Sequence, residues 1–316
     1  MRFSKTTVWI ITALVLIFYI LNGLIMIETT GHPIGLCDFD FHLDKINGAP
    51  TQYTKDCYDN DPTTTTPKQF EVGFPSYPSL SHSVLKWVGV RTQIELFLVM
   101  LLIVVVIPVW LFVENVNPIA GFIFLCFSLI HLEILQATIP QAIVVALFLV
   151  YLFKFRKNYY VLTIFALLSI GLHREGVFFF FIVAMLEFVD THFSKFLKER
   201  IVLFSAPFVP KLTLKSIETI PETFLFSVPF WLIWITRKSF INSIFKMGLL
   251  TVSLIGVFTF SFRIAWIAQV LLTVELAKEI HEGNIKHEKL LIASMVLFLA
   301  IELAYFATTN YAFFFK

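Results

Sequence analysis

Seven residues near the N-terminus carry a dense set of groups that could do chemistry. Within CDFDFHLDK (37–45), Asp38, Asp40 and Asp44 alternate with apolar residues, and His42 lies among them. Clustered carboxylates can hold a divalent cation through oxygen ligands. One of them can instead take a proton from a hydroxyl nucleophile. The motif therefore offers candidate ligands of a divalent cation such as Mg²⁺ or Mn²⁺, or a candidate general base.

The remaining sequence indicates where this motif lies. Of 316 residues, 58% are hydrophobic and 15% are charged, whereas a soluble domain carries about 25% charged residues. Many apolar stretches approach the roughly 20 residues that a helix needs to cross a bilayer. The sequence predicts an all-α polytopic membrane protein, with residues 1–316 forming a single transmembrane domain. The net charge of +2 gives no indication of a nucleic-acid partner.

About 11 transmembrane helices are expected. The first, 8–27, is too long for the apolar core of a signal peptide and lacks a small-residue cleavage site, so we expect it to be retained. The sequences APFVP and IPETF interrupt the region 201–236, which forms either two short spans or a re-entrant pair. The other candidates are 94–113, 119–137, 139–153, 159–172, 176–189, 201–211, 223–236, 244–262, 264–277 and 290–307.

The basic residues predict the orientation, because cytoplasmic loops are rich in Lys and Arg. With the N-terminus in the cytoplasm, most of the 24 basic residues fall on the inner side, and the C-terminus of this cell-membrane protein is external. Residues 28–90 then form a long external loop that contains the acidic motif. Cys37 and Cys57 lie in this loop, where a disulfide is permitted.

Polar residues from distant segments converge on the predicted external side. Each has an ordinary explanation by itself, such as a solvated loop or a snorkelling arginine. Together they resemble a functional site, because ionisable residues within a membrane cost free energy and usually have a function. The planar guanidinium group of arginine is also suited to bind phosphate. The candidate substrate-binding residues are His42, His82, Glu133, His173, Arg174, Glu175 and Arg263.

Three segments resemble the GT-C glycosyltransferases, polytopic enzymes that transfer sugars from polyprenyl-phosphate carriers. CDFDFHL (37–43) is similar to the Asp, aromatic and His pattern that opens their first external loop. YPSLSHSVLKWVG (77–89) resembles the Tyr-Pro run that ends it, with Ser79 in place of a second proline. FRIAWIAQVLL (262–272) resembles the arginine that opens a late span.

This resemblance implies a membrane glycosyltransferase that moves a sugar from a polyprenyl-phosphate carrier to an external acceptor with inversion. Asp38 or Asp40 would serve as the general base or as a metal ligand, with Asp38 slightly preferred. Arg263 would bind the departing phosphate. Members often carry a further soluble domain, so the resemblance implies that such an acceptor-binding domain is either absent here or supplied by a partner subunit. GLHREG (171–176) is also similar to turns of membrane polysaccharide polymerases, which keeps polymerisation open.

Two other classes of protein stay open. A transporter or flippase for a lipid-linked or anionic substrate would need charge near the membrane midplane and broken helices repeated in both halves. The helix breakers at 201–236 have no earlier counterpart in the sequence. A non-catalytic subunit of a membrane complex would need no site at all.

The predicted topology can be tested by cysteine labelling from outside the cell, in a variant without the three native cysteines. We expect a membrane-impermeant maleimide to modify Thr64→Cys, in the external loop, but not Leu197→Cys, in a cytoplasmic one. The reverse labelling pattern would overturn the orientation.

Overall fold

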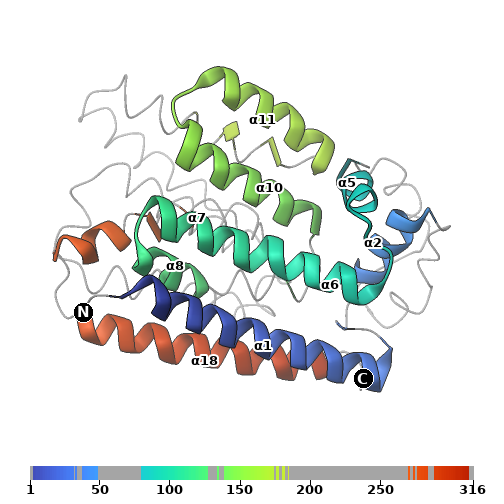
Figure 1. Cartoon of the computed structure of the whole chain (residues 1–316), viewed down its shortest axis with the longest axis horizontal. Helices are drawn as coiled ribbons and strands as arrows, with labels where there is room; N and C mark the ends of the chain where they lie inside the picture. The colour runs from blue at the N-terminus through green and yellow to red at the C-terminus, as the bar shows by residue number, and fades with distance from the viewer. Residues whose placement is uncertain are drawn as a thin grey trace, which may run out of the picture.

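The computed structural model describes residues 3–31, 33, 38–48, 80–126, 134, 139–173, 176–177, 180–181, 184, 270, 273–274, 276–283 and 288–312. The named elements of this part are all helical, as the sequence predicts (Figure 1). They are α1 (Lys5–Thr30), α2 (Asp38–Asn47), α5 (Leu80–Val88), α6 (Gln93–Leu101), η1 (Leu102–Val106), α7 (Ile107–Asn115), α8 (Pro118–Leu125), α10 (Ile139–Val150), η2 (Tyr151–Phe155), α11 (Tyr159–Leu172) and α18 (Glu288–Ala312). The two η elements are π-helical turns.

Three helices of the described part are long and apolar enough to cross a membrane: Lys5–Thr29, Gln93–Asn115 and Glu288–Thr308. Two shorter apolar helices cover Ile139–Phe155 and Tyr159–Leu172. These five coincide with the spans expected at 8–27, 94–113, 290–307, 139–153 and 159–172. The span expected at 119–137 begins with α8 and then largely leaves the described residues, and the spans expected between 176 and 277 lie mostly or wholly outside them.

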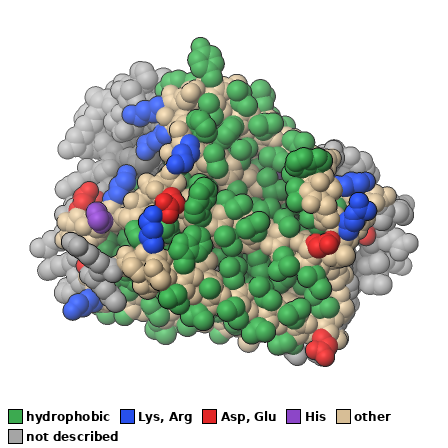
Figure 2. All heavy atoms as spheres, in the orientation of Figure 1, with side chains coloured by type: hydrophobic (Ala, Val, Ile, Leu, Met, Phe, Trp, Pro, Cys, Tyr) green, Lys and Arg blue, Asp and Glu red, His purple; other side chains and the backbone are tan. Residues whose placement is uncertain are grey.

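The surface supports a membrane location. Figure 2 shows that charged side chains gather toward the two ends of the visible face, while hydrophobic side chains cover most of the area between them. A face of this kind suits the hydrocarbon core of a bilayer, in which charged groups are expensive. We conclude that the protein is a membrane protein with several candidate spans and that its described part is all-α.

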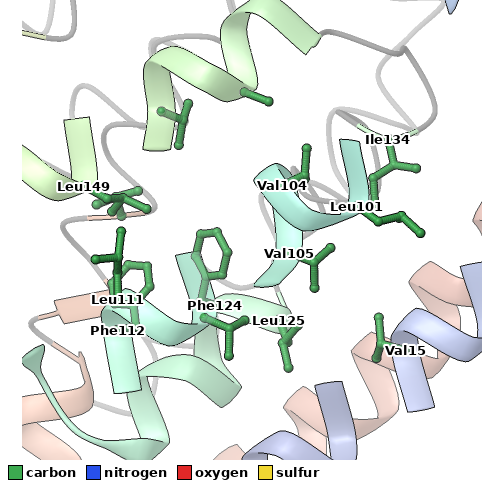
Figure 3. Packing of buried hydrophobic residues seen from close by; sticks show 14 of the residues in the cluster. Val15, Leu101, Val104, Val105, Leu111, Phe112, Phe124, Leu125, Ile134 and Leu149 are labelled. Carbon is green, nitrogen blue, oxygen red and sulfur yellow. The ribbon is translucent and has the colours of Figure 1, made fainter. Parts of the chain in front are cut away.

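A continuous helix formed by α6, η1 and α7 occupies the centre of the bundle and contacts α1, α8 and α10. Its inward side chains, among them Leu101, Val105 and Phe112, are buried (Figure 3). The π-turn has a local cause, because Pro108 has no N–H and its ring would clash with the carbonyl of Val104. The preceding turn widens, and the backbone N–H of Ile107 donates to the Leu102 carbonyl.

Polar contacts hold the two ends of the bundle. At one end, Lys5 Nζ lies 2.8 Å from Glu114 Oε1, which joins the start of α1 to the end of α7. Asn117 caps α8 and also donates from Nδ2 to the Ala277 carbonyl at 3.2 Å. At the opposite end, Asn47 Nδ2 donates to the Arg91 carbonyl at 3.0 Å. This bond ties α2 to the turn before α6.

The first and last helices, α1 and α18, lie side by side (Figure 1). The ring of Tyr19 meets that of Phe306 edge to face, with centroids 4.8 Å apart, and both side chains are buried. Glu302, one turn earlier in α18, is only 2% exposed and lies close enough to act electrostatically on Tyr19. A buried carboxyl therefore lies in the seam between these two helices.

We expect Phe306→Ala to destabilise the protein by about 3–5 kcal/mol, because it removes a buried ring and leaves a cavity. Leu297→Ala, at an exposed position of the same helix, serves as the matched control and should change stability little. Thermal unfolding in detergent measures both. Equal falls in melting temperature would contradict the packing described here.

Candidate functional site

The acidic motif forms a helix, α2, rather than an extended loop. Its buried positions are Phe39, His42 and Ile46, at spacings of three and four residues. Such spacing places all three on one face of a helix. The motif is therefore anchored by apolar residues on either side of a buried histidine.

A second histidine comes from α5, which packs against α2. Ser81, His82 and Leu85 form the buried face of α5. His42 Nδ1 lies 2.9 Å from His82 Nε2, within hydrogen-bonding distance, and the two rings are stacked with centroids 5.2 Å apart. Which nitrogen carries the shared proton depends on the tautomers. This contact joins residues that are 40 positions apart in the sequence.

A third histidine, His173, lies where α11 ends. Its backbone N–H donates to the Ser169 carbonyl, and its carbonyl accepts from the N–H of Gly176, both at 2.7 Å. A Cβ at position 176 would lie 3.0 Å from the side chains of Ser169 and Val144. Glycine therefore allows the GLHREG turn to fold closely onto α10 and α11, and this turn fixes the position of His173.

Another glycine places α5 beside this turn. A Cβ at Gly171 would lie 3.1 Å from Leu80 Cδ2, so the absence of a side chain lets the start of α5 rest on the last turn of α11. The exposed fractions of His42, His82 and His173 are 5%, 6% and 6%. Three buried histidines from three separate segments thus gather at one end of the bundle.

The environment keeps His42 uncharged at neutral pH. Burial, followed by the influence of His82 and His173, lowers the pKa of His42 from 6.5 to about 3. A neutral imidazole offers one donor and one acceptor nitrogen. His42 is therefore suited to orient a hydrogen-bonded group and poorly suited to balance the charge of a phosphate.

The helical form of α2 places positions 38 and 40 on different sides of the helix axis. At 3.6 residues per turn, position 38 lies about 40° around the helix from His42, one turn earlier, whereas position 40 lies about 160° away. Residues two apart on a helix do not face each other. By helical position alone, residue 38 therefore lies closer than residue 40 to the side of α2 that carries His42.

Within the part of the chain that the structure describes, no three His, Cys, Asp or Glu side chains are spaced to hold a metal ion. The imidazoles of the cluster suit transition metals, whereas Mg²⁺ prefers oxygen ligands. The side chains of Asp38 and Asp40, the expected ligands of Mg²⁺ or Mn²⁺, lie outside the description, so this metal site stays a prediction.

Sequence reasoning missed three buried polar residues. Ser81 Oγ and both polar atoms of the Gln141 side chain are buried, and no hydrogen bond to them occurs in the described part of the chain. Such groups need an explanation in a native structure. Gln141 lies in the first turn of α10, the end nearer α5 in Figure 1. The third residue is Glu302. Its carboxyl group within an apolar span was a signal in the sequence that could have identified it.

Several predicted residues lie outside the described residues: Glu133, Arg174, Glu175 and Arg263 of the candidate site, and Cys37 and Cys57 of the possible disulfide.

No model of a known protein family matches this chain, and neither a curated protein nor a solved structure shows significant similarity to it.

The lowered pKa of His42 predicts an acid-sensitive fold. Between pH 6.5 and about 3 the unfolded chain binds the His42 proton more readily than the folded chain, so stability falls as the pH falls through this window. The loss should reach about 2 kcal/mol by pH 5, at 1.36 kcal/mol per unit.

His42→Asn should remove part of this loss while keeping a hydrogen-bonding group near the position of Nδ1. His281→Asn, at an exposed histidine, is the matched control. Unfolding midpoints in detergent at pH 7 and pH 5 measure the difference. An unchanged pH dependence in His42→Asn would contradict the assignment.

Proposed function

We propose that the protein is a membrane glycosyltransferase that uses a polyprenyl-phosphate-linked sugar and acts at the histidine end of the bundle, on the external side of the membrane. The observation that carries this proposal is the gathering of His42, His82 and His173, buried and from three separate segments, at one end of an apolar bundle. An apolar bundle has no need of such a cluster for packing.

In this proposal the acceptor hydroxyl attacks the anomeric carbon of the carrier-bound sugar from the face opposite the phosphate. The new bond joins the acceptor oxygen to that carbon, the bond from that carbon to the phosphate oxygen breaks, and the hydroxyl proton passes to the carboxylate of Asp38. The inversion expected from the resemblance follows from this geometry. The phosphate leaves with the carrier.

The remaining residues have binding roles in the proposed reaction. The neutral His42 and its neighbours His82 and His173 orient hydroxyl groups by hydrogen bonds, since each neutral imidazole both donates and accepts. Arg174 and Arg263 supply the positive charge that a departing phosphate needs, because guanidinium groups bind phosphate through paired hydrogen bonds.

A transporter of a lipid-linked or anionic substrate is the second candidate, and Glu302 is the observation that favours it. Intramembrane carboxyls often mark substrate or proton pathways. Reconstituted protein separates the two candidates. Movement of a labelled lipid between leaflets without sugar transfer would support the transporter and reject the enzyme.

The proposal predicts that Asp38→Asn slows sugar transfer by about 100-fold or more, because the amide cannot accept the hydroxyl proton. Asp40→Asn is the matched control on the same helix and should keep the rate within about tenfold of the wild type. The measurement is the initial rate of labelled sugar transfer in proteoliposomes, with a panel of polyprenyl-phosphate sugars.

Both variants should keep the thermal stability of the wild type, since neither change alters size. Full activity of a folded Asp38→Asn protein would reject Asp38 as the base, and absence of transfer by the wild type with the whole panel would reject the proposed function.

A further inference from the structure

Helix α5 has three distinct faces. Ser81, His82 and Leu85 are buried against the protein, as described above. Ser83 and Lys86 form an exposed polar strip. The rest of the exposed surface is an apolar stripe formed by Leu80, Val84, Trp87 and Val88, at successive spacings of four, three and one residues.

The apolar stripe is not explained by packing within the chain. Trp87, the largest side chain of α5, is 87% exposed. An amphipathic helix in water would turn these residues inward and its serine and histidine outward. On α5 the reverse holds for Ser81 and His82, which are buried, while a tryptophan and two valines are exposed.

The stripe is continuous with the outer surface of α11. Leu80 rests on Gly171 in the last turn of α11. The outer face of α11 is formed by Ile164, Leu167 and Leu168, all exposed and apolar. The stripe of α5 therefore extends an apolar surface that already belongs to a helix of the apolar bundle.

The length of α11 gives an independent reason for this extension. Its 14 residues rise by about 21 Å at 1.5 Å per residue, whereas the hydrocarbon core of a bilayer is about 30 Å thick. A helix lying across the end of α11 adds apolar surface where α11 is too short. The exposed Lys86 beside Trp87 also suits the interface, where aromatic and basic side chains anchor proteins.

We infer that α5 lies in the surface of the membrane, with Leu80, Val84, Trp87 and Val88 against the acyl chains of bilayer lipids and with Ser83 and Lys86 toward water. The expected external loop 28–90 then returns to the bilayer before the second span begins. His82, on the opposite face of the same helix, lies about one helix diameter, roughly 10 Å, from those lipids. This inference does not depend on the proposed glycosyl transfer.

Site-directed spin labelling of the full chain in phosphatidylcholine–phosphatidylglycerol vesicles tests it. A nitroxide is attached to single cysteines, in the variant without native cysteines, at Val84→Cys and Trp87→Cys on the stripe. Ser83→Cys and Lys86→Cys are the matched positions on the polar strip, and Leu167→Cys on α11 is the lipid-facing reference. Collision rates with oxygen, which dissolves in lipid, and with a water-soluble nickel complex are then compared.

The expected result is a reversal along one helix. Positions 84 and 87 should match position 167, with oxygen collisions favoured, and positions 83 and 86 should favour the nickel complex. Equal access of the nickel complex to all four positions of α5 would place the helix in water and overturn the inference. Protection of 84 and 87 from both reagents would also overturn it, because protein rather than lipid would then cover the stripe. If Trp87→Cys does not fold, Val88→Cys replaces it on the same stripe.

Discussion

The packing of the continuous helix from Gln93 to Asn115 against α1, α8 and α10 is the constraint on which the rest of the described structure depends. This helix is the most buried of the three candidate spans. The π-turn at Leu102–Val106 lets the helix remain continuous although Pro108 has no backbone N–H. Because a membrane offers no water to unsatisfied backbone groups, the bundle needs such a continuous centre. Polar side chains are correspondingly concentrated toward the ends.

The apolar segments of the sequence predicted much of this arrangement. The apolar runs located five helices within a few residues, because a continuous apolar stretch in a membrane protein has few alternatives to a helix. Asn158, for example, caps α11 at the residue before its expected start. The helical form of the acidic motif was harder to predict, since alternating Asp and Phe residues suggest the two-residue period of an extended strand. Burial of Phe39, His42 and Ile46 shows a helical period instead.

The sequence-based grouping of the three histidines agrees with their gathering at one end of the bundle, whereas their contacts could not be predicted. His42, His82 and His173 were placed on one side from topology alone, yet no sequence pattern could reveal that His42 and His82 approach to 2.9 Å or that the cluster is buried. The position of His173 beside this pair depends on two close approaches, at Gly171 and Gly176, which only the packed helices define. Gln141 has no signal of its own in the sequence, because a glutamine within an apolar helix is equally compatible with many surroundings.

The carboxyl of Glu302 in the seam between α1 and α18 has a consequence for biosynthesis. An acidic side chain near the middle of a span disfavours insertion of that helix by about 2.5–3.5 kcal/mol on translocon scales. Contact with Tyr19 and the surrounding side chains of α1 lowers this barrier, because it removes the carboxyl from lipid. The helix that carries this carboxyl therefore inserts most readily beside α1, so α1 must keep its side toward α18 uncovered until α18 is made.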